Sequence, residues 1–148
     1  MKKEYHKIIC AAYLVLVDEE KVLLLRRANT GYEDGNYSVP AGHVEADESV
    51  AHALVREAFE EVGITIDPDD VFLKHVMHRR ATETNEERLD FFFACSQWSG
   101  DVTNQEPHKC DELRWCSINT LPENVIPYVK KGVEVSLKTQ ALYSERGW

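Results

Sequence analysis

The stretch from Gly42 to Ile64, GHVEADESVAHALVREAFEEVGI, constrains the fold more than any other part of the sequence. Ser49 is of a type that caps helix N-termini, and Gly63 is of a type that ends helices in the left-handed conformation. Between them, apolar residues recur at steps of three and four, which is the spacing of one helix face. These residues are Ala51, Leu54, Val55, Ala58 and Val62. The pattern predicts a short helix from Ser49 to Val62.

Three carboxylates, those of Glu57, Glu60 and Glu61, crowd the last two turns of this predicted helix. Like charges four residues apart cost roughly 0.2–0.5 kcal/mol, and anions near a helix C-terminus cost a further ~0.3–1 kcal/mol. Arg56 can offset one of these charges but not three. A divalent cation can offset the rest, and carboxylate oxygens are ligands that suit Mg²⁺ or Mn²⁺. Taken alone, the cluster leaves a solvated acidic helix face as the alternative.

The spacing of the whole stretch narrows these alternatives. Five residues separate Gly42 from Glu48, and seven residues separate Glu48 from Arg56. The run Arg56-Glu57-Ala58-Phe59-Glu60-Glu61 then follows, and one residue separates it from Gly63-Ile64. This pattern resembles the signature of the Nudix hydrolases, with Ala58 as the one soft departure because a larger aliphatic residue is frequent there. The resemblance implies an α/β fold, an α/β/α sandwich with a mixed β-sheet between helices.

Length and composition favour one domain over residues 1–148, with the Nudix box at residues 42–64. A chain of 148 residues with 43% hydrophobic content suits a single compact core. The net charge of −9 argues against a nucleic-acid polymer as the main ligand, because such binders usually carry a basic face. No stretch is long enough to span a membrane, and the short N-terminal apolar run is interpreted as a strand. Four cysteines without a CxxC pair favour reduced thiols and a cytoplasmic location.

The remaining chain divides into strands, two polar loops and a closing helix. The predicted strands are Lys7–Val17, Lys21–Arg27, Ser38–His43, Val71–Arg80, Arg88–Trp98 and Glu112–Cys116. The pair Val71–Arg80 and Arg88–Trp98 is expected to be antiparallel. The loops are Ala28–Tyr37 and Ser99–Asp111, and an amphipathic helix is expected over Ile126–Ser144.

The resemblance also implies roles for residues of the box. Glu57, Glu60 and Glu61 would act in catalysis and hold one or more Mg²⁺ ions, for which Mn²⁺ can substitute. The backbone carbonyl of Ala41 would complete the metal shell, although the family more often has a second glycine at that position. Supporting roles in the loop and helix are expected for Gly42, Glu48, Arg56 and Gly63.

Outside the box, the general base is expected to be either a box glutamate or one from a later loop. Glu106 is favoured, because it lies a similar distance before the next strand as in MutT-type members, and Glu112 is the rival. Arg27 matches a nucleotide-contacting arginine of those members, and Asn124 resembles the asparagine that reads a purine edge. Tyr37 is a candidate for stacking on a base, as is Tyr32 in the same loop.

The expected substrate is a small nucleotide, a nucleoside diphosphate linked to a group X. The run that marks NADH-cleaving members is missing after the box, as is the coenzyme A signature. About sixteen residues beyond the box, a proline is typical of ADP-ribose members and a tyrosine is typical of dinucleoside-polyphosphate members. This chain has Arg79 and Arg80 there instead. Elimination favours a nucleoside triphosphate or an oxidised purine triphosphate, cleaved to monophosphate and pyrophosphate. Another nucleotide, a non-catalytic nucleotide sensor and a homodimer are left open, and the intact box argues against an isoprenyl diphosphate isomerase.

Overall fold

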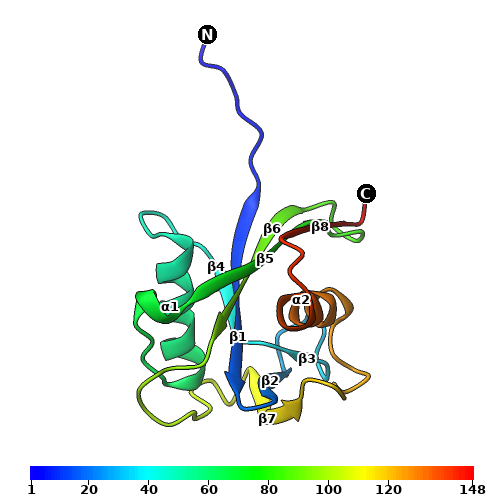
Figure 1. The fold of residues 1–148 in the computed structure, drawn as a ribbon. Helices are drawn as coiled ribbons and strands as arrows, with labels where there is room; N and C mark the ends of the chain where they lie inside the picture. The colour runs from blue at the N-terminus through cyan, green and yellow to red at the C-terminus, as the bar shows by residue number, and fades with distance from the viewer.

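Strand β1 (Ile9–Asp18) runs through the middle of the molecule and has strands on both sides (Figure 1). The structure is a computed structural model and describes residues 1–148. The other elements are β2 (Lys21–Arg27), β3 (Tyr37–Ser38), β4 (Ala41–His43), α1 (Val50–Val62), a 3-10 turn (Pro68–Asp70), β5 (Phe72–Arg80), β6 (Glu87–Cys95), β7 (Cys110–Ser117), α2 (Pro127–Lys138) and β8 (Tyr143–Arg146). No helix is both long enough and apolar enough to cross a membrane.

The eight strands form one mixed sheet, as expected. The strand order is β3-β2-β1-β6-β5-β8, with β4 paired to β1 and β7 paired to β2. The β1–β6 and β5–β8 pairs are parallel, and the other strand pairs are antiparallel. The predicted antiparallel pairing of the two strands after the box is therefore confirmed as β5 with β6.

The two helices cover opposite faces of this sheet, which confirms the α/β/α sandwich (Figure 1). Strand β1 shows why, because its side chains alternate between the two faces. Ala12, Leu14 and Leu16 pack with α1, whereas Tyr13 and Val15 pack with α2. A strand buried on both faces is apolar along its length, as this one is.

The caps of α1 are those that the sequence predicts. The hydroxyl of Ser49 accepts a hydrogen bond from the N–H of His52, and Gly63 adopts the left-handed conformation with φ 72°. Its buried face is shifted slightly from the predicted one: Ala53 is fully buried, whereas Ala51 and Val55 are partly exposed.

Two predicted elements differ in the structure. The predicted strand Ser38–His43 is divided at Pro40 into β3, which pairs with β2, and β4, which pairs with β1. Proline has no N–H to donate to a ladder, so one continuous strand cannot form there. The predicted loop Ala28–Tyr37 accordingly ends one residue earlier.

The predicted helix Ile126–Ser144 is wrong at its C-terminal end. Helix α2 ends at Lys138, and Tyr143–Arg146 forms β8 along the otherwise open edge of β5. The buried imidazole of His75 holds this segment, with Nδ1 2.7 Å from the carbonyl oxygen of Ala141 and Nε2 2.7 Å from Oγ of Ser144. These long-range contacts override the helical periodicity of the segment.

Candidate active site and metal site

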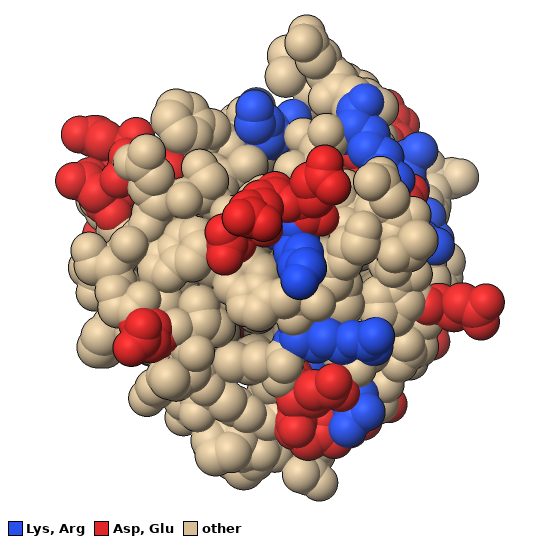
Figure 2. Space-filling view, turned by 60° about the horizontal axis from the view of Figure 1, so that its bottom comes forward, with Lys and Arg blue, Asp and Glu red and all other residues tan.

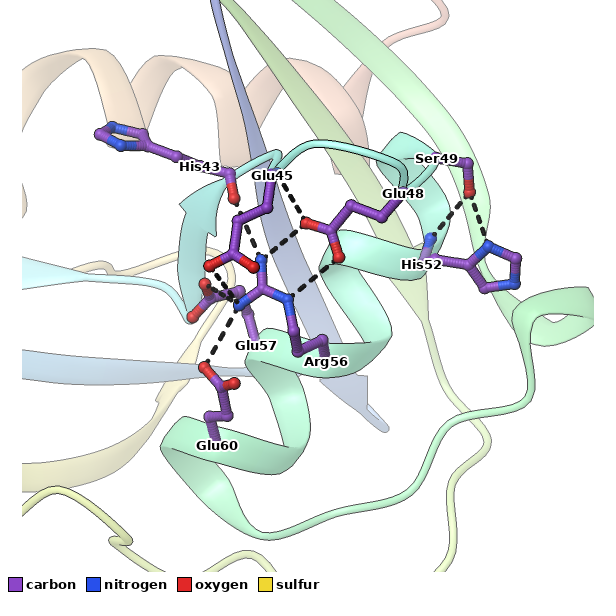
Figure 3. A network of polar contacts seen from close by, with 8 residues as sticks. All are labelled: His43, Glu45, Glu48, Ser49, His52, Arg56, Glu57 and Glu60. Atoms are coloured by element: carbon purple, nitrogen blue, oxygen red, sulfur yellow. Dashed lines mark hydrogen bonds and ion pairs between the residues drawn. The ribbon is translucent and has the colours of Figure 1, made fainter.

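Arg56 lies at the centre of a carboxylate cluster on α1 and the loop before it (Figure 3). Its Nη2 and Nε donate to the two oxygens of Glu48 at 2.8 and 3.1 Å. Its Nη1 donates to Glu57 at 2.8 Å and to Glu60 at 3.3 Å. Nη2 also donates to the carbonyl oxygen of His43 at 3.1 Å, so Arg56 ties β4 to the helix.

Glu48 closes the loop between β4 and α1. Its carboxylate accepts hydrogen bonds from Arg56 and from the N–H of Glu45, the latter at 2.8 Å. These two interactions, that with Arg56 being the larger, lower the pKa of Glu48 to about 2. Glu48 and Arg56 thus connect the loop to the helix.

Glu57 lies against Gly42, and this contact requires glycine at that position. A Cβ atom added at Gly42 would overlap the carboxylate of Glu57. Burial raises the pKa of Glu57, with Arg56 opposing the increase and Glu60 and Glu106 adding to it. This close approach brings β4, which carries Ala41 and Gly42, against α1.

Glu61 is the most deeply placed carboxylate of the cluster. One of its oxygens accepts a hydrogen bond from the backbone N–H of Ala41 at 3.0 Å. Burial, and after it the charge of Glu57, raise the pKa of Glu61 well above its ordinary value, and Glu106 adds to the effect. The site therefore gathers more negative charge than its cations neutralise.

The donor set fits a hard divalent cation, because it consists of carboxylate and carbonyl oxygens with an excess of negative charge. No three His, Cys, Asp or Glu side chains converge on one point in this structure in the arrangement of a metal site. Arg56 binds both Glu57 and Glu60 through the same Nη1 atom. A cation bound to Glu57 or Glu60 would compete with Arg56 for the same oxygens.

The loop that carries Glu106 docks onto the C-terminal end of α1. The N–H groups of Thr103 and Gln105 donate to the carbonyl oxygens of Val62 and Glu61, at 3.0 and 3.1 Å. These bonds satisfy helix carbonyls that would otherwise lack partners. They also place the carboxylate of Glu106 near Glu57 and Glu61, whose pKa values it raises. The rival Glu112 is bound instead by the hydroxyl of Tyr37 at 2.7 Å and by Arg26 at 3.3 Å.

A cavity of about 820 Å³ opens beside Glu61 on the α2 face of the sheet. Of the predicted site residues, Arg27, Tyr32, Ala41, Gly42 and Glu61 line it. Arg27 and Arg26 lie apart, as strand alternation predicts. Arg27 faces the cavity and donates to the carbonyl oxygen of Tyr32 at 2.8 Å, whereas Arg26 pairs with Asp111 at 2.7 Å.

Tyr37 and Asn124 do not line this cavity. Tyr37 is buried in the α2-side core, and only 4% of its surface is exposed, so its ring is not available for stacking on a base. The side chain of Asn124 donates to the carbonyl oxygen of Gly35 at 2.9 Å, and its backbone oxygen accepts from the N–H of Tyr37. Both residues thus hold the loop beneath Arg27, a role that their polar and aromatic character did not predict.

Several cavity residues were missed by the sequence reasoning. They are Arg79, Arg80, Arg88, Tyr128 and Arg146, which line the same cavity as Glu61. Strand alternation places Arg79 on the same face as His75 and Met77, and this period of two could have identified it. The contributions of Tyr128 and Arg146 depend on how α2 and β8 pack, for which the sequence carries no local signal.

Charged side chains of both signs lie beside one another on the face shown in Figure 2, where no broad basic patch is present. This distribution agrees with the net charge of −9. It does not favour a polyanionic partner on this face.

Comparison with known proteins identifies relatives. The family profile described as the NUDIX domain matches residues 8–134. The NAD-capped RNA hydrolase NudC of Stutzerimonas stutzeri is 29% identical over 119 residues, which are 80% of this chain and 40% of that protein. The phosphatase NudJ of Escherichia coli is 35% identical over 81 residues, 55% of this chain and 51% of that protein. The chain therefore spans about half or less of the length of these curated relatives.

Solved structures show the same fold. The crystal structure of a MutT NUDIX hydrolase from Burkholderia pseudomallei superimposes with a TM-score of 0.81. The match covers 90% of this chain and 100% of that one, at 22% sequence identity. At this identity the likeness concerns the fold alone.

Proposed function

This chain belongs to the Nudix hydrolase family, and from that membership we propose that it hydrolyses a phosphoanhydride bond of a nucleoside diphosphate linked to X. The favoured substrate is a nucleoside triphosphate or an oxidised purine triphosphate, and the products are a nucleoside monophosphate and pyrophosphate. The reaction depends on Mg²⁺, for which Mn²⁺ can substitute.

One observation carries the proposal: the carboxylates of the box lie next to a cavity that also holds Arg27. Glu61 and the Ala41 backbone form part of the cavity wall, and Glu57 packs against Gly42 directly behind it. A cavity of about 820 Å³ is within the usual size of small-molecule sites. Its walls therefore offer both oxygen ligands for a cation and a guanidinium for phosphate.

Each residue has a separate task in this reaction. Glu57, Glu60 and Glu61 hold the cation together with the Ala41 carbonyl. When bound, the cation neutralises charge on the phosphate oxygens and lowers the pKa of water. Arg56 orients Glu57 and Glu60, and Arg27 contacts the nucleotide.

Glu106 is proposed as the base that accepts the proton of the attacking water. As the new bond from the water oxygen to phosphorus forms, the bond to the bridging oxygen breaks, and pyrophosphate leaves. The docked loop places Glu106 near Glu57 and Glu61, and this position supports Glu106 as the base. Glu112 is less suited, because the hydroxyl of Tyr37 and the guanidinium of Arg26 both bind its carboxylate, whereas Glu106 has one ion pair, with Lys109 at 3.6 Å.

The names of the relatives do not transfer their substrates to this chain. NudC is named for NAD-capped RNA, but the run that marks NADH-cleaving members is missing here. The net charge of −9 also does not favour an RNA polymer. Both points support a free nucleotide as the substrate.

The test is an assay of the purified protein against a panel of nucleotides, with identification of the products. Mg²⁺-dependent release of pyrophosphate is expected, and it should be lost in Glu60→Gln and in Glu61→Gln. Glu123→Gln, at an exposed carboxylate without an ion pair, is the control and should keep full activity. Normal turnover in both box variants would contradict the carboxylate assignment. Stabilisation by nucleotides without any product would instead identify a nucleotide-sensing module.

A further inference from the structure

Arg79 is a buried cation that the proposed reaction does not use. Its side chain is 6% exposed, and its Nε donates to Asp90, whose side chain is fully buried, at 2.7 Å. The guanidinium lies over the ring of Tyr128, 3.6 Å from the ring centroid. Asp90 on β6 and Tyr128 on α2 therefore hold Arg79 in one orientation from two sides.

The outer edge of this guanidinium faces the cavity. Neither Nη atom makes a hydrogen bond within the protein, and the one fully buried polar side-chain atom without a partner is Oδ1 of Asp90. The Nη atoms are therefore reached from the cavity that Arg79 lines. They present two parallel N–H donors, a fork that matches a pair of adjacent acceptors.

The position of Arg79 separates it from the phosphate end of the site. Ala41 on β4 pairs with Tyr13 on β1, which pairs with Phe92 on β6, which pairs with His75 on β5. Strands β4 and β5 are therefore three strand spacings apart, a distance of about 14 Å across the sheet. Arg79 lies four residues farther along β5, about 13 Å, so it is remote from a phosphate held at Ala41. A nucleotide whose phosphates are held at Ala41 would therefore meet Arg79 with its opposite end, the base.

The surroundings of Arg79 favour a base over a second phosphate. Asp90 already balances the charge of Arg79, so the pair offers directed donors without net positive charge. Tyr13, Val39, Ile126 and Tyr128 line the cavity together with charged side chains that include those of Arg80, Arg88 and Arg146. The guanidinium of Arg79 itself lies on the ring of Tyr128, so its donors lie beside an aromatic surface. Apolar surface with a few directed polar groups is typical of small-molecule sites.

Resting on the proposed function, we propose that Arg79 determines base specificity by donating both Nη–H groups to a base edge with two adjacent acceptors. Guanine offers such an edge in O6 and N7, and cytosine in O2 and N3. Adenine presents a donor beside each ring acceptor on its exposed edges, and uracil has an N–H between its two carbonyls. The substrate class is therefore guanine or cytosine nucleotides.

The experiment measures kcat/KM for GTP, CTP, ATP and UTP in the wild type and in Arg79→Lys, which keeps the charge beside Asp90 but loses the fork. The wild type should prefer GTP or CTP over ATP and UTP by about tenfold or more, the worth of a bidentate contact. In Arg79→Lys the preference should fall below about threefold, mainly through KM. The matched control is Arg26→Lys, which keeps the positive charge of a side chain that pairs with Asp111 outside the cavity, and it should leave the preference unchanged.

Binding of GMP, CMP, AMP and UMP, measured by calorimetry without metal, gives a second readout that does not require turnover. The same preference, lost in Arg79→Lys, is expected. If no triphosphate is cleaved but this preference is present, the proposed function fails and the assignment of Arg79 stands. Preference for ATP or UTP in the wild type, or an equal loss for all four bases in Arg79→Lys, would overturn the assignment. Should Arg79→Lys not fold, Arg79→Gln and the wild-type preference provide the same test.

Discussion

At the scale of single residues, Arg56 organises the box. One guanidinium contacts Glu48, Glu57, Glu60 and the carbonyl of His43 (Figure 3). The like charges that would destabilise the end of an isolated helix are thereby tied to one cation. Glu61 lies outside this network and is bound by the Ala41 N–H instead. The carboxylates consequently differ in their roles even without a metal.

Gly42→Ala tests the contact between β4 and Glu57. The added Cβ would displace the Glu57 carboxylate, while the fold tolerates the change because a glutamate side chain can swing away. A misplacement of about 1 Å in a catalytic group costs on the order of 100-fold, so pyrophosphate release should fall by about that factor. The melting temperature should change little.

A double-mutant cycle controls this prediction. In a Glu57→Ala background the carboxylate is absent, and Gly42→Ala should then cause no further loss of activity. Additive losses in the double variant would show that Gly42 acts independently of Glu57.

Glu48→Gln tests the ion pair with Arg56 through its pH dependence. The pKa of Glu48 in the folded state is about 2, below its ordinary value of 4.5. Its ionised form therefore stabilises the fold above about pH 4.5, and this contribution is lost as the pH falls toward 2. Urea unfolding should show a difference between wild type and variant at pH 7 that shrinks by pH 3. Glu123→Gln should show no such trend, and a difference that stays constant with pH would contradict the assignment.

At the scale of elements, β8 is fixed by one buried side chain. His75 is 1% exposed, and its two ring nitrogens contact the carbonyl of Ala141 and the hydroxyl of Ser144. These contacts help to pair the segment after α2 with β5 as strand β8, and β8 places Arg146 in the cavity wall. An element that the sequence did not predict thus completes the cavity.

Ser144→Ala should destabilise the protein by about 1–2 kcal/mol, because it leaves one ring nitrogen of the buried His75 without a partner. Chemical denaturation followed by tryptophan fluorescence measures this change. Glu145→Gln, on the same strand but exposed, is the control and should stay within about 0.5 kcal/mol of the wild type. Equal stability of Ser144→Ala and wild type would show that β8 is held by its backbone pairing alone.

At the scale of the whole molecule, the excess of negative charge suits a protein that works with a bound cation. The net charge is −9, and two of the carboxylates, those of Glu57 and Glu61, are largely buried beside the cavity. A cation that binds the folded state and not the unfolded chain stabilises the fold.

Mg²⁺ added to metal-free protein should therefore raise the Tm without any nucleotide. At a concentration 100 times its Kd the stabilisation is about 2.7 kcal/mol, which corresponds to a Tm increase of roughly 5–10 °C for a domain of this size. Chelation by EDTA should reverse the increase, and Glu57→Gln should reduce it. An unchanged Tm up to millimolar Mg²⁺ would contradict a cation site at these carboxylates.

The sequence by itself determined the parts of this protein that depend on neighbouring residues. Helix α1, its Ser49 cap and its Gly63 end follow from periodicity and capping within the segment from Ser49 to Gly63. The β5–β6 hairpin and the doubly buried β1 follow from apolar pattern, and the α/β/α sandwich follows from the resemblance of the box. Such features are encoded locally, because each depends on dihedral preferences and spacing along one segment.

Only the tertiary structure decided what faces the cavity. The burial of Tyr37, the docking of the Glu106 loop on α1, the orientation of Arg79 and the conversion of Tyr143–Arg146 to a strand all depend on contacts between distant segments. Strand register and helix packing set these contacts, and a shift of one residue in register reverses the face of every side chain on a strand. The reaction class therefore comes from the contiguous box, whereas the residues that choose the base come from strands and helices far apart in the chain.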